Sequence, residues 1–252
     1  MRTIAIANQK GGSGKTTTAV NVAAALAATR GDRVLVIDFD PQGNASRWLG
    51  VSTEEPAPLE VLTDGRALAD LVQPTSAPGV DAIPSSPWLR RADKALAAEP
   101  GAETLLRRAL SKLPRSWSFV VIDCSPWLGL LTVSALTACR ELLVPVEAST
   151  TATEGLRDLT KTIDKVREGL NPSLAMLGIL PFRVDARRVV DREVVDSVRK
   201  HFGRSVFRTV IHESAKLREA GSHAKPIQVY APTSRAADEF RAIANEIRRR
   251  SP

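Results

Sequence analysis

The chain has 252 residues, of which 43% are hydrophobic and 25% are charged, and its formal net charge is +7. This length suits one α/β domain with a sizeable core. Two cysteines, Cys124 and Cys139, are too few for a disulfide framework. No stretch approaches the roughly eighteen apolar residues of a membrane-spanning helix. We therefore expect a soluble intracellular protein with a single domain over residues 1–252.

The excess positive charge lies in the last part of the chain. Residues 1–182 contain 19 basic and 19 acidic residues, whereas residues 183–252 contain 16 basic and 9 acidic residues. A charge gathered in this way predicts a surface for a polyanion. The alternative is a solvated basic face that has no partner.

The first predicted elements are a strand, a glycine-rich loop and a helix. Residues 2–8, RTIAIAN, are typical of a buried parallel strand. Residues 16–31 are rich in alanine and end at a glycine, as a helix with a glycine C-cap does. Between them, Gly11, Gly12 and Gly14 let the backbone fold tightly and point its N–H groups inward as an anion nest. This order of elements is the context of a phosphate-binding loop.

Apolar strand candidates and helical patterns alternate along the rest of the chain. Further strands are predicted at 33–40, 80–86, 118–125, 141–148 and 174–182, helices at 105–113, 156–166 and 190–202, and a surface loop at 51–60. Alternation of this kind predicts an α/β fold with a mostly parallel central sheet flanked by helices on both faces.

The glycine-rich loop, within NQKGGSGKTTTA, departs from the usual phosphate-binding pattern. The pattern G-x-x-x-x-G-K-[ST] requires a glycine where this chain has Gln9. The loop instead fits K-G-G-x-G-K-T-T, which has a second lysine at its start. In a phosphate-binding loop, Lys15 would bind the β- and γ-phosphates and the Thr16 hydroxyl would ligate Mg²⁺. The role of Lys10 needs a separate explanation.

This variant resembles the deviant Walker P-loop ATPases, the group that includes ParA partition proteins, MinD and the nitrogenase iron protein. The resemblance implies that the first lysine, Lys10, crosses a dimer interface to the partner's nucleotide. It also implies ATP and Mg²⁺ as cofactors. The nucleotide-binding loop then consists of Lys10, Gly11, Gly12, Ser13, Gly14, Lys15, Thr16 and Thr17.

Acidic residues follow two of the predicted strands. Asp38 and Asp40 end the strand in VIDFDPQGNA, and Asp123 ends the strand in FVVID. Ligands of parallel sheets bind at the carboxyl ends of the strands. Four apolar residues before an aspartate form a Walker B pattern, which holds Mg²⁺ through water. Together with the glycine loop, these residues predict a metal–nucleotide site.

Four further segments narrow the resemblance to the ParA family. They are VLVIDFDPQGNAS, VVIDCSPWLGLLTVSAL, LVPVEASTTATEGL and KLREAGSHAKPI. The resemblance implies that Asp40 positions the attacking water, that Asp38 supports Mg²⁺ and the switch region, and that Asp123 is the Walker B acid. VIHES stands where many relatives have a proline and an asparagine beside adenine, so His212 and Ser214 are the candidates for contact with the base.

The same resemblance predicts a role in DNA binding for the basic C-terminal part of the chain. It implies that an ATP-bound sandwich dimer binds DNA without sequence preference, mainly through residues 183–252. By position, Arg187 and Lys216 match the family's DNA contacts, and Arg188 and Arg218 lie near them. Slow hydrolysis, stimulated by a ParB-like adaptor, would release the DNA. The expected place is the cytoplasm, on the nucleoid.

Four alternative functions belong to the same group of ATPases. A ParA-like ATPase that positions a protein cargo remains open. A MinD-like membrane ATPase needs an exposed amphipathic tail, whereas a closing helix explains the apolar face of residues 235–249 better. A nitrogenase-type ATPase would use two cysteines for an iron–sulfur cluster, but both read as buried small residues. A tyrosine kinase of this group needs a tyrosine-rich tail, and Tyr230 is the only tyrosine.

Overall fold

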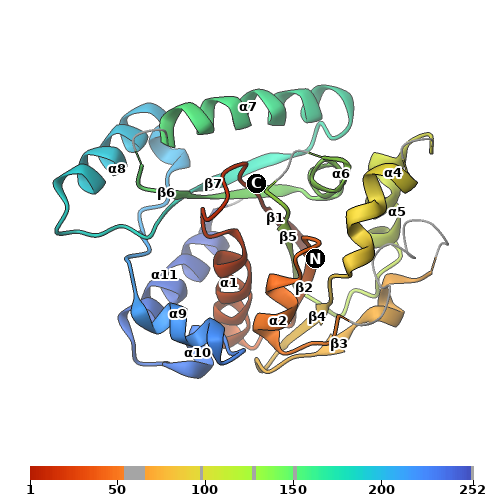
Figure 1. Cartoon of the computed structure of the whole chain (residues 1–252), viewed down its shortest axis with the longest axis horizontal. Coiled ribbons are helices and arrows are strands. Elements are labelled where there is room, and N and C mark those ends of the chain that lie inside the picture. The colour runs from red at the N-terminus through yellow and green to blue at the C-terminus, as the bar shows by residue number, and fades with distance from the viewer. Residues whose placement is uncertain (54–65, 97–98, 127–128, 150–151, 251–252) are drawn as a thin grey trace.

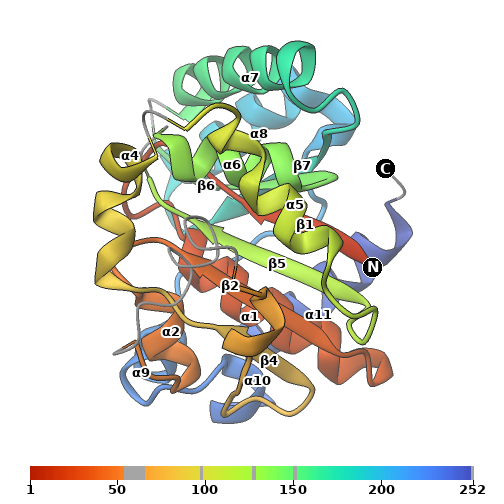
Figure 2. The ribbon, with the colours of Figure 1, turned by 90° about the vertical axis from the view of Figure 1, so that its right-hand side faces the viewer.

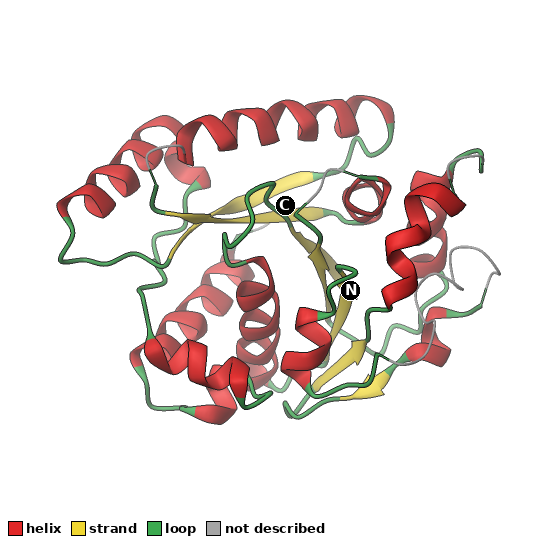
Figure 3. Ribbon diagram, viewed as in Figure 1, coloured by secondary structure: helices red, strands yellow, loops and turns green. Residues whose placement is uncertain are grey.

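The computed structural model describes residues 1–53, 66–96, 99–126, 129–149 and 152–250. Its centre is a seven-stranded sheet of order β3-β4-β2-β5-β1-β6-β7, with helices on both faces (Figures 1 and 3). The strands are β1 (Arg2–Ile6), β2 (Val34–Phe39), β3 (Gln73–Pro74), β4 (Val80–Ile83), β5 (Phe119–Cys124), β6 (Glu141–Glu147) and β7 (Ala175–Phe182). All neighbouring pairs except β3 and β4 are parallel. The predicted fold class is confirmed.

Two layers of helices cover this sheet. One face carries α1 (Lys15–Arg30), α2 (Asn44–Leu49), α9 (Ala215–Ser222), α10 (Ile227–Tyr230) and α11 (Arg235–Arg249). The other carries α4 (Ala92–Ala95), α5 (Leu105–Ser111), α6 (Leu130–Ala138), α7 (Ala152–Gly169) and α8 (Val189–Phe202). Short 3₁₀ helices occupy Leu68–Leu71, Pro87–Arg91, Ala102–Thr104 and Gly203–Ser205. Alternate strand residues face the two layers, because side chains of a strand alternate in direction.

Helix α1 lies between the sheet and α11 (Figure 2). Its alanine side chains are small, so the sheet and α11 can both approach the helix closely. Most residues of α1 are therefore buried. Helix α11 packs Phe240, Ile243 and Ile247 fully into the same core. The apolar face of residues 235–249 is therefore internal, as expected for a closing helix. Among the described residues, no helix is long and apolar enough to cross a membrane.

The predicted strands agree with the observed ones to within three residues at each end. The helix after the glycine loop ends as predicted, at Gly31, whose φ of 66° is left-handed and whose N–H donates to the Ala27 carbonyl oxygen. The short antiparallel strand β3 was not predicted. Part of the loop predicted at 51–60 lies outside the described residues.

The two ends of the chain are joined through Arg2. Its guanidinium forms an ion pair with the fully buried Glu141 of β6. It also donates to the carbonyl oxygens of Ile247 (2.9 Å) and Arg250 (3.1 Å) at the end of α11. A buried carboxylate tolerates burial only while such a partner remains. Arg2 thus fixes both the sheet and the last helix.

Replacing Arg2 by methionine should lower the free energy of unfolding by about 3 kcal/mol or more, because Glu141 is left charged and unpaired. The double variant Arg2→Met/Glu141→Leu should regain much of this loss. Urea denaturation followed by tryptophan fluorescence measures both. Equal losses in the single and double variants would contradict an essential ion pair.

Candidate nucleotide and metal site

The glycine loop joins β1 to α1 at the carboxyl edge of the sheet. Gly12 and Gly14 have φ values of 74° and 87°, in the left-handed region. A Cβ atom on Gly14 would lie 2.3 Å from Cε1 of Phe182, which comes from the end of β7. Both the backbone and the close approach therefore require glycine at position 14. Helix α1 begins at Lys15 without a side-chain cap, so its first N–H groups remain available to an anion.

The two lysines of the loop point to different places. Lys15 is 7% exposed, and its ammonium donates to the Lys10 carbonyl oxygen at 3.2 Å. Burial lowers the pKa of Lys15, while Asp123 and Asp40 act in the opposite direction. Lys10 is exposed, and its ammonium instead donates to Ser149 Oγ at 3.1 Å. Lys15 is therefore turned into the loop, whereas Lys10 is turned towards the segment after β6.

Two of the three predicted carboxylates lie directly beside each other. In the parallel register of β2 and β5, Asp38 is opposite Asp123, and both are almost completely buried. Asp38 accepts hydrogen bonds from the Ser46 N–H (2.7 Å) and hydroxyl (2.6 Å). Asp123 accepts one from the Thr16 hydroxyl (2.7 Å). Within the described residues, Asp123 Oδ1 has no hydrogen-bond partner.

Burial makes the ionised form of both acids less favourable than it is in water. Burial raises the pKa of Asp38 to about 6, against the effect of its hydrogen bonds from Ser46. Burial and the Asp38 charge raise the pKa of Asp123 well above its usual value. A bound cation would reverse both shifts.

Asp40 lies at the side of the site and is 6% exposed. One carboxylate oxygen, Oδ1, accepts from the Gln42 N–H at 3.0 Å. Its backbone carbonyl accepts from the Ser85 hydroxyl, and the Ser85 N–H donates to Ser46 Oγ at 2.8 Å. Ser46 thus links the end of β2 to the segment after β4. In the described part of the chain, Asp40 Oδ2 has no protein donor and is left for a ligand.

A cavity of about 690 Å³ opens above the glycine loop. Of the predicted site residues, it is lined by Gly11, Gly12, Gly14, Lys15, Thr16, Thr17, Asp40, His212, Ser214 and Arg218. Lys10, Ser13, Asp38 and Asp123 are not part of this lining. The structure therefore brings the loop and the two predicted base-side residues to one cavity and leaves Lys10 outside it.

His212 and Ser214, the candidates for contact with the adenine base, also stabilise the local structure. His212 pairs through its backbone with Val184, and its Nδ1 lies 2.7 Å from Glu239 Oε1. Ser214 is the N-cap of α9, where its hydroxyl accepts from the Leu217 N–H at 3.4 Å. A helix cap and a hydrogen bond to Glu239 thus hold these two side chains at the cavity wall.

Several lining residues escaped the sequence analysis. Phe182 and Arg183 come from the end of β7, and Arg183 has a left-handed φ of 55°. Trp48 of α2 packs on Gly221 of α9, where a Cβ would lie 3.3 Å from the indole, and its Nε1 donates to the Lys225 carbonyl oxygen. Trp48 and Arg183 lie outside the segments quoted above, and the strand predicted at 174–182 contains Phe182 without singling it out.

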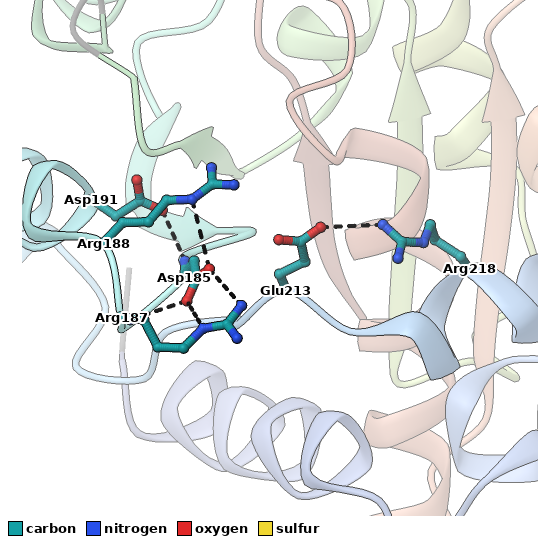
Figure 4. A network of polar contacts seen from close by, with 6 residues as sticks. All are labelled: Asp185, Arg187, Arg188, Asp191, Glu213 and Arg218. Atoms are coloured by element: carbon teal, nitrogen blue, oxygen red, sulfur yellow. Dashed lines mark hydrogen bonds and ion pairs between the residues drawn. The ribbon is translucent and has the colours of Figure 1, made fainter.

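Three of the four predicted nucleic-acid residues, Arg187, Arg188 and Arg218, lie on two neighbouring segments (Figure 4). Arg187 donates three hydrogen bonds to Asp185, two from its guanidinium and one from its backbone N–H, and Arg188 lies 3.6 Å from the same carboxylate. Arg218 pairs with Glu213 at 3.2 Å. The bonds from Arg187 lower the pKa of Asp185 to about 2. Lys216 similarly pairs with Glu219 at 3.0 Å. All four cations are exposed, and each has an acidic partner.

The donor set fits a magnesium-bound nucleoside triphosphate. The unpartnered Asp123 Oδ1 and the Thr16 hydroxyl are oxygen ligands of the kind Mg²⁺ uses, directly or through water. Among the described residues, no three His, Cys, Asp or Glu side chains converge on a metal site. Mg²⁺ does not need such a cage, since phosphates and water supply most of its ligands. Glycine N–H groups and Lys15 supply the phosphate cradle.

The pKa of Asp38 predicts a pH dependence in protein free of nucleotide and metal. An acid with a raised folded-state pKa holds more protons when folded, so stability falls as pH rises from about 3.8 to about 6. The unfolding free energy of wild type, taken relative to that of Asp38→Asn, should therefore fall by roughly 2.5 kcal/mol between pH 4 and pH 7. Urea titrations at several pH values measure it, and a constant difference would contradict the shift.

Comparison with known proteins places this site in a family. Residues 1–176 match a family model described as an AAA domain. The sporulation initiation inhibitor protein Soj of Bacillus subtilis is 41% identical, with 97% of each chain covered. The chromosome-partitioning ATPase Soj of Thermus thermophilus is 44% identical, with 98% of this chain and 95% of the relative covered.

A solved structure shares the fold and holds a ligand of the expected kind. It is named cobyrinic acid a,c-diamide synthase from Mycobacterium smegmatis, with a bound ATP analogue and magnesium. It is 33% identical with a TM-score of 0.84, over 97% of this chain and 93% of that one. ATP and Mg²⁺ are accordingly the cofactors of this site. With the two-lysine glycine loop and relatives above 40% identity along nearly its whole length, the chain belongs to the ParA/Soj family of partitioning ATPases.

Proposed function

We propose that this ATPase works as an ATP-dependent dimer that binds DNA and releases it on hydrolysis, with a ParB-like adaptor stimulating the release. The observation that carries the proposal is the divergence of the two loop lysines. Lys15 lines the cavity, whereas Lys10 lies outside it and is exposed. A cation so close to a nucleotide site, yet turned away from it, is suited to the nucleotide of a second copy.

The residues divide the chemistry as follows. The loop N–H groups and Lys15 hold the phosphates, and Thr16 with Asp123 holds Mg²⁺. The bound Mg²⁺ offsets negative charge on the phosphate oxygens. Asp40 presents its unpartnered oxygen to the attacking water and orients it. Asp38, bonded by Ser46, holds the end of β2 in place and so supports the metal site and the segment after it.

DNA is the partner that the charge distribution supports. The whole excess of seven positive charges lies after residue 182. Arg187, Arg188, Lys216 and Arg218 are exposed there and are proposed as phosphate contacts. Phosphates would replace Asp185, Glu213 and Glu219 as their partners. Contacts of this kind carry no base information, so binding is independent of sequence.

The two lysines should respond differently to replacement. Lys15→Ala should abolish ATP binding, because it removes the phosphate partner inside the cavity. Lys10→Ala should leave binding measurable but remove ATP-dependent dimerisation and hydrolysis. Nucleotide titration and size-exclusion chromatography measure these steps. Lys112→Ala is the control, because Lys112 is an exposed lysine that lines neither the nucleotide cavity nor the pocket beside Asp40. Normal hydrolysis by Lys10→Ala would refute the role across the dimer interface.

Arg187→Glu and Lys216→Glu should each weaken the binding of ATP-loaded protein to any duplex. Each lost phosphate contact should flatten the plot of log affinity against log salt by about 0.9. Lys161→Glu on α7 is a matched control, because Lys161 pairs with Asp158 three residues away, much as Lys216 pairs with Glu219. Fluorescence anisotropy on two unrelated duplexes measures the effect. Unchanged affinity in both variants would show a solvated face only.

A further inference from the structure

A second cleft, of about 1340 Å³, lies at the amino end of β7 between α8 and α11. The two helices flank β7 on opposite sides of the sheet (Figure 1). Five arginines line this cleft: Arg199, Arg204, Arg208, Arg249 and Arg250. Glu246 is the one acidic residue in its described lining. We call this the arginine cleft.

The arginines of the cleft differ in the hydrogen bonds and ion pairs that their guanidiniums make. Arg250 is structural: it donates to the carbonyl oxygens of Leu177 and Val206, and its guanidinium lies 4.1 Å from the Phe207 ring centroid. Arg199 donates once, to the Arg208 carbonyl oxygen. In contrast, the exposed guanidiniums of Arg204, Arg208 and Arg249 have no hydrogen bond or ion pair within the described residues.

Glu246 cannot neutralise these three groups. Its carboxylate accepts from the backbone N–H groups of Arg208 (3.0 Å) and Thr209 (3.3 Å) and from Arg250 (2.8 Å). The cleft therefore retains a strong positive charge. The exposed cations Arg187 and Lys216 differ in this respect, since each has a carboxylate at hydrogen-bond distance.

Helix-end preferences explain only part of this cluster. Basic residues are favoured in the last turn of a helix, which accounts for Arg199 in α8 and Arg249 in α11. Arg204 and Arg208 lie beyond α8, in a 3₁₀ turn and a loop. The apolar residues of the floor, Val206 and Phe207, are at most 5% exposed. Leu177 is buried as well, Met176 is only partly exposed, and Ala242 is exposed but small. Among the described lining residues, therefore, no large apolar side chain is exposed as an anchor for a protein partner, whereas free guanidiniums bind phosphate bidentately.

The arginine cleft is well separated from the nucleotide cavity. Met176 lines the first and Phe182 lines the second, at opposite ends of β7. Six residue steps of a strand span about 20 Å. No residue lines both cavities in the described structure. Charge in the cleft is thus available whether or not a nucleotide is bound.

We propose that the arginine cleft is a second duplex-binding surface, which grips the sugar–phosphate backbone through Arg204, Arg208 and Arg249 independently of ATP. That the polyanion bound in the cleft is DNA rests on the proposed function. The cleft adds a contact that persists after hydrolysis, when the ATP-dependent surface has released. The protein would then stay weakly associated with DNA between cycles.

The test uses the full chain with the double variant Arg204→Glu/Arg249→Glu. Arg108→Glu/Arg115→Glu is the matched control, because these arginines are exposed, lie outside both cavities and change the charge equally. Anisotropy of two unrelated duplexes is measured over a salt series, without nucleotide and with ATP. The cleft variant should lose tenfold or more in affinity in both states, and its salt slope should flatten by about 1.8. Its hydrolysis rate without DNA should equal that of wild type.

The outcomes separate this inference from the proposed function. If the cleft variant behaves as the control does while Arg187→Glu and Lys216→Glu lose binding, the cleft inference is overturned and the proposed function stands. If only the cleft variant loses binding, the cleft stands and the proposed surface falls. An effect confined to the ATP state refutes independence from nucleotide. Polyglutamate binding that needs the cleft, with duplex binding unchanged, would overturn it in favour of an acidic protein partner.

Discussion

The nucleotide site depends on two buried carboxylates, Asp38 and Asp123, that lie side by side. Because β2 and β5 are parallel and in register, Asp38 must lie beside Asp123. Burial and like charge make both ionised forms unfavourable until a cation arrives. Thr16 and Ser46 supply the hydrogen bonds that fix the pair meanwhile. A cation at this edge of the sheet would offset the cost of burying the two charges.

The same constraint ties the ends of several strands together. Ser46 bonds to Asp38 and also to the backbone after β4, so the segment after β2 is held from two sides. Phe182, at the end of β7, covers the glycine loop at Gly14. A change at the carboxylates is therefore connected by direct contact to the segment that carries Asp40.

Sequence patterns predicted the long strands and the motifs at their ends well. Buried parallel strands are continuous apolar runs, and the glycine loop and the three aspartates are local signals at strand ends. Two-residue β3 and the six residues of α2 are too short to show a period. Trp48 against Gly221, and Phe182 against Gly14, join residues more than 160 positions apart. Such contacts follow from the tertiary fold, so no local pattern could reveal them.

The placement of charge shows the same limit most clearly. The sequence located the excess in residues 183–252 but could not say which cations already have partners. In the fold, Asp185 and Glu219 pair with Arg187 and Lys216 near the nucleotide cavity. Arg249, from the last turn of α11, has no such partner in the part of the chain that the structure describes. A paired cation must exchange a carboxylate for a phosphate, whereas an unpaired one loses only water, so the net gain on meeting DNA is larger at the unpaired group. Counting charges along the chain therefore identifies the basic region, and only the pairing in three dimensions ranks its members.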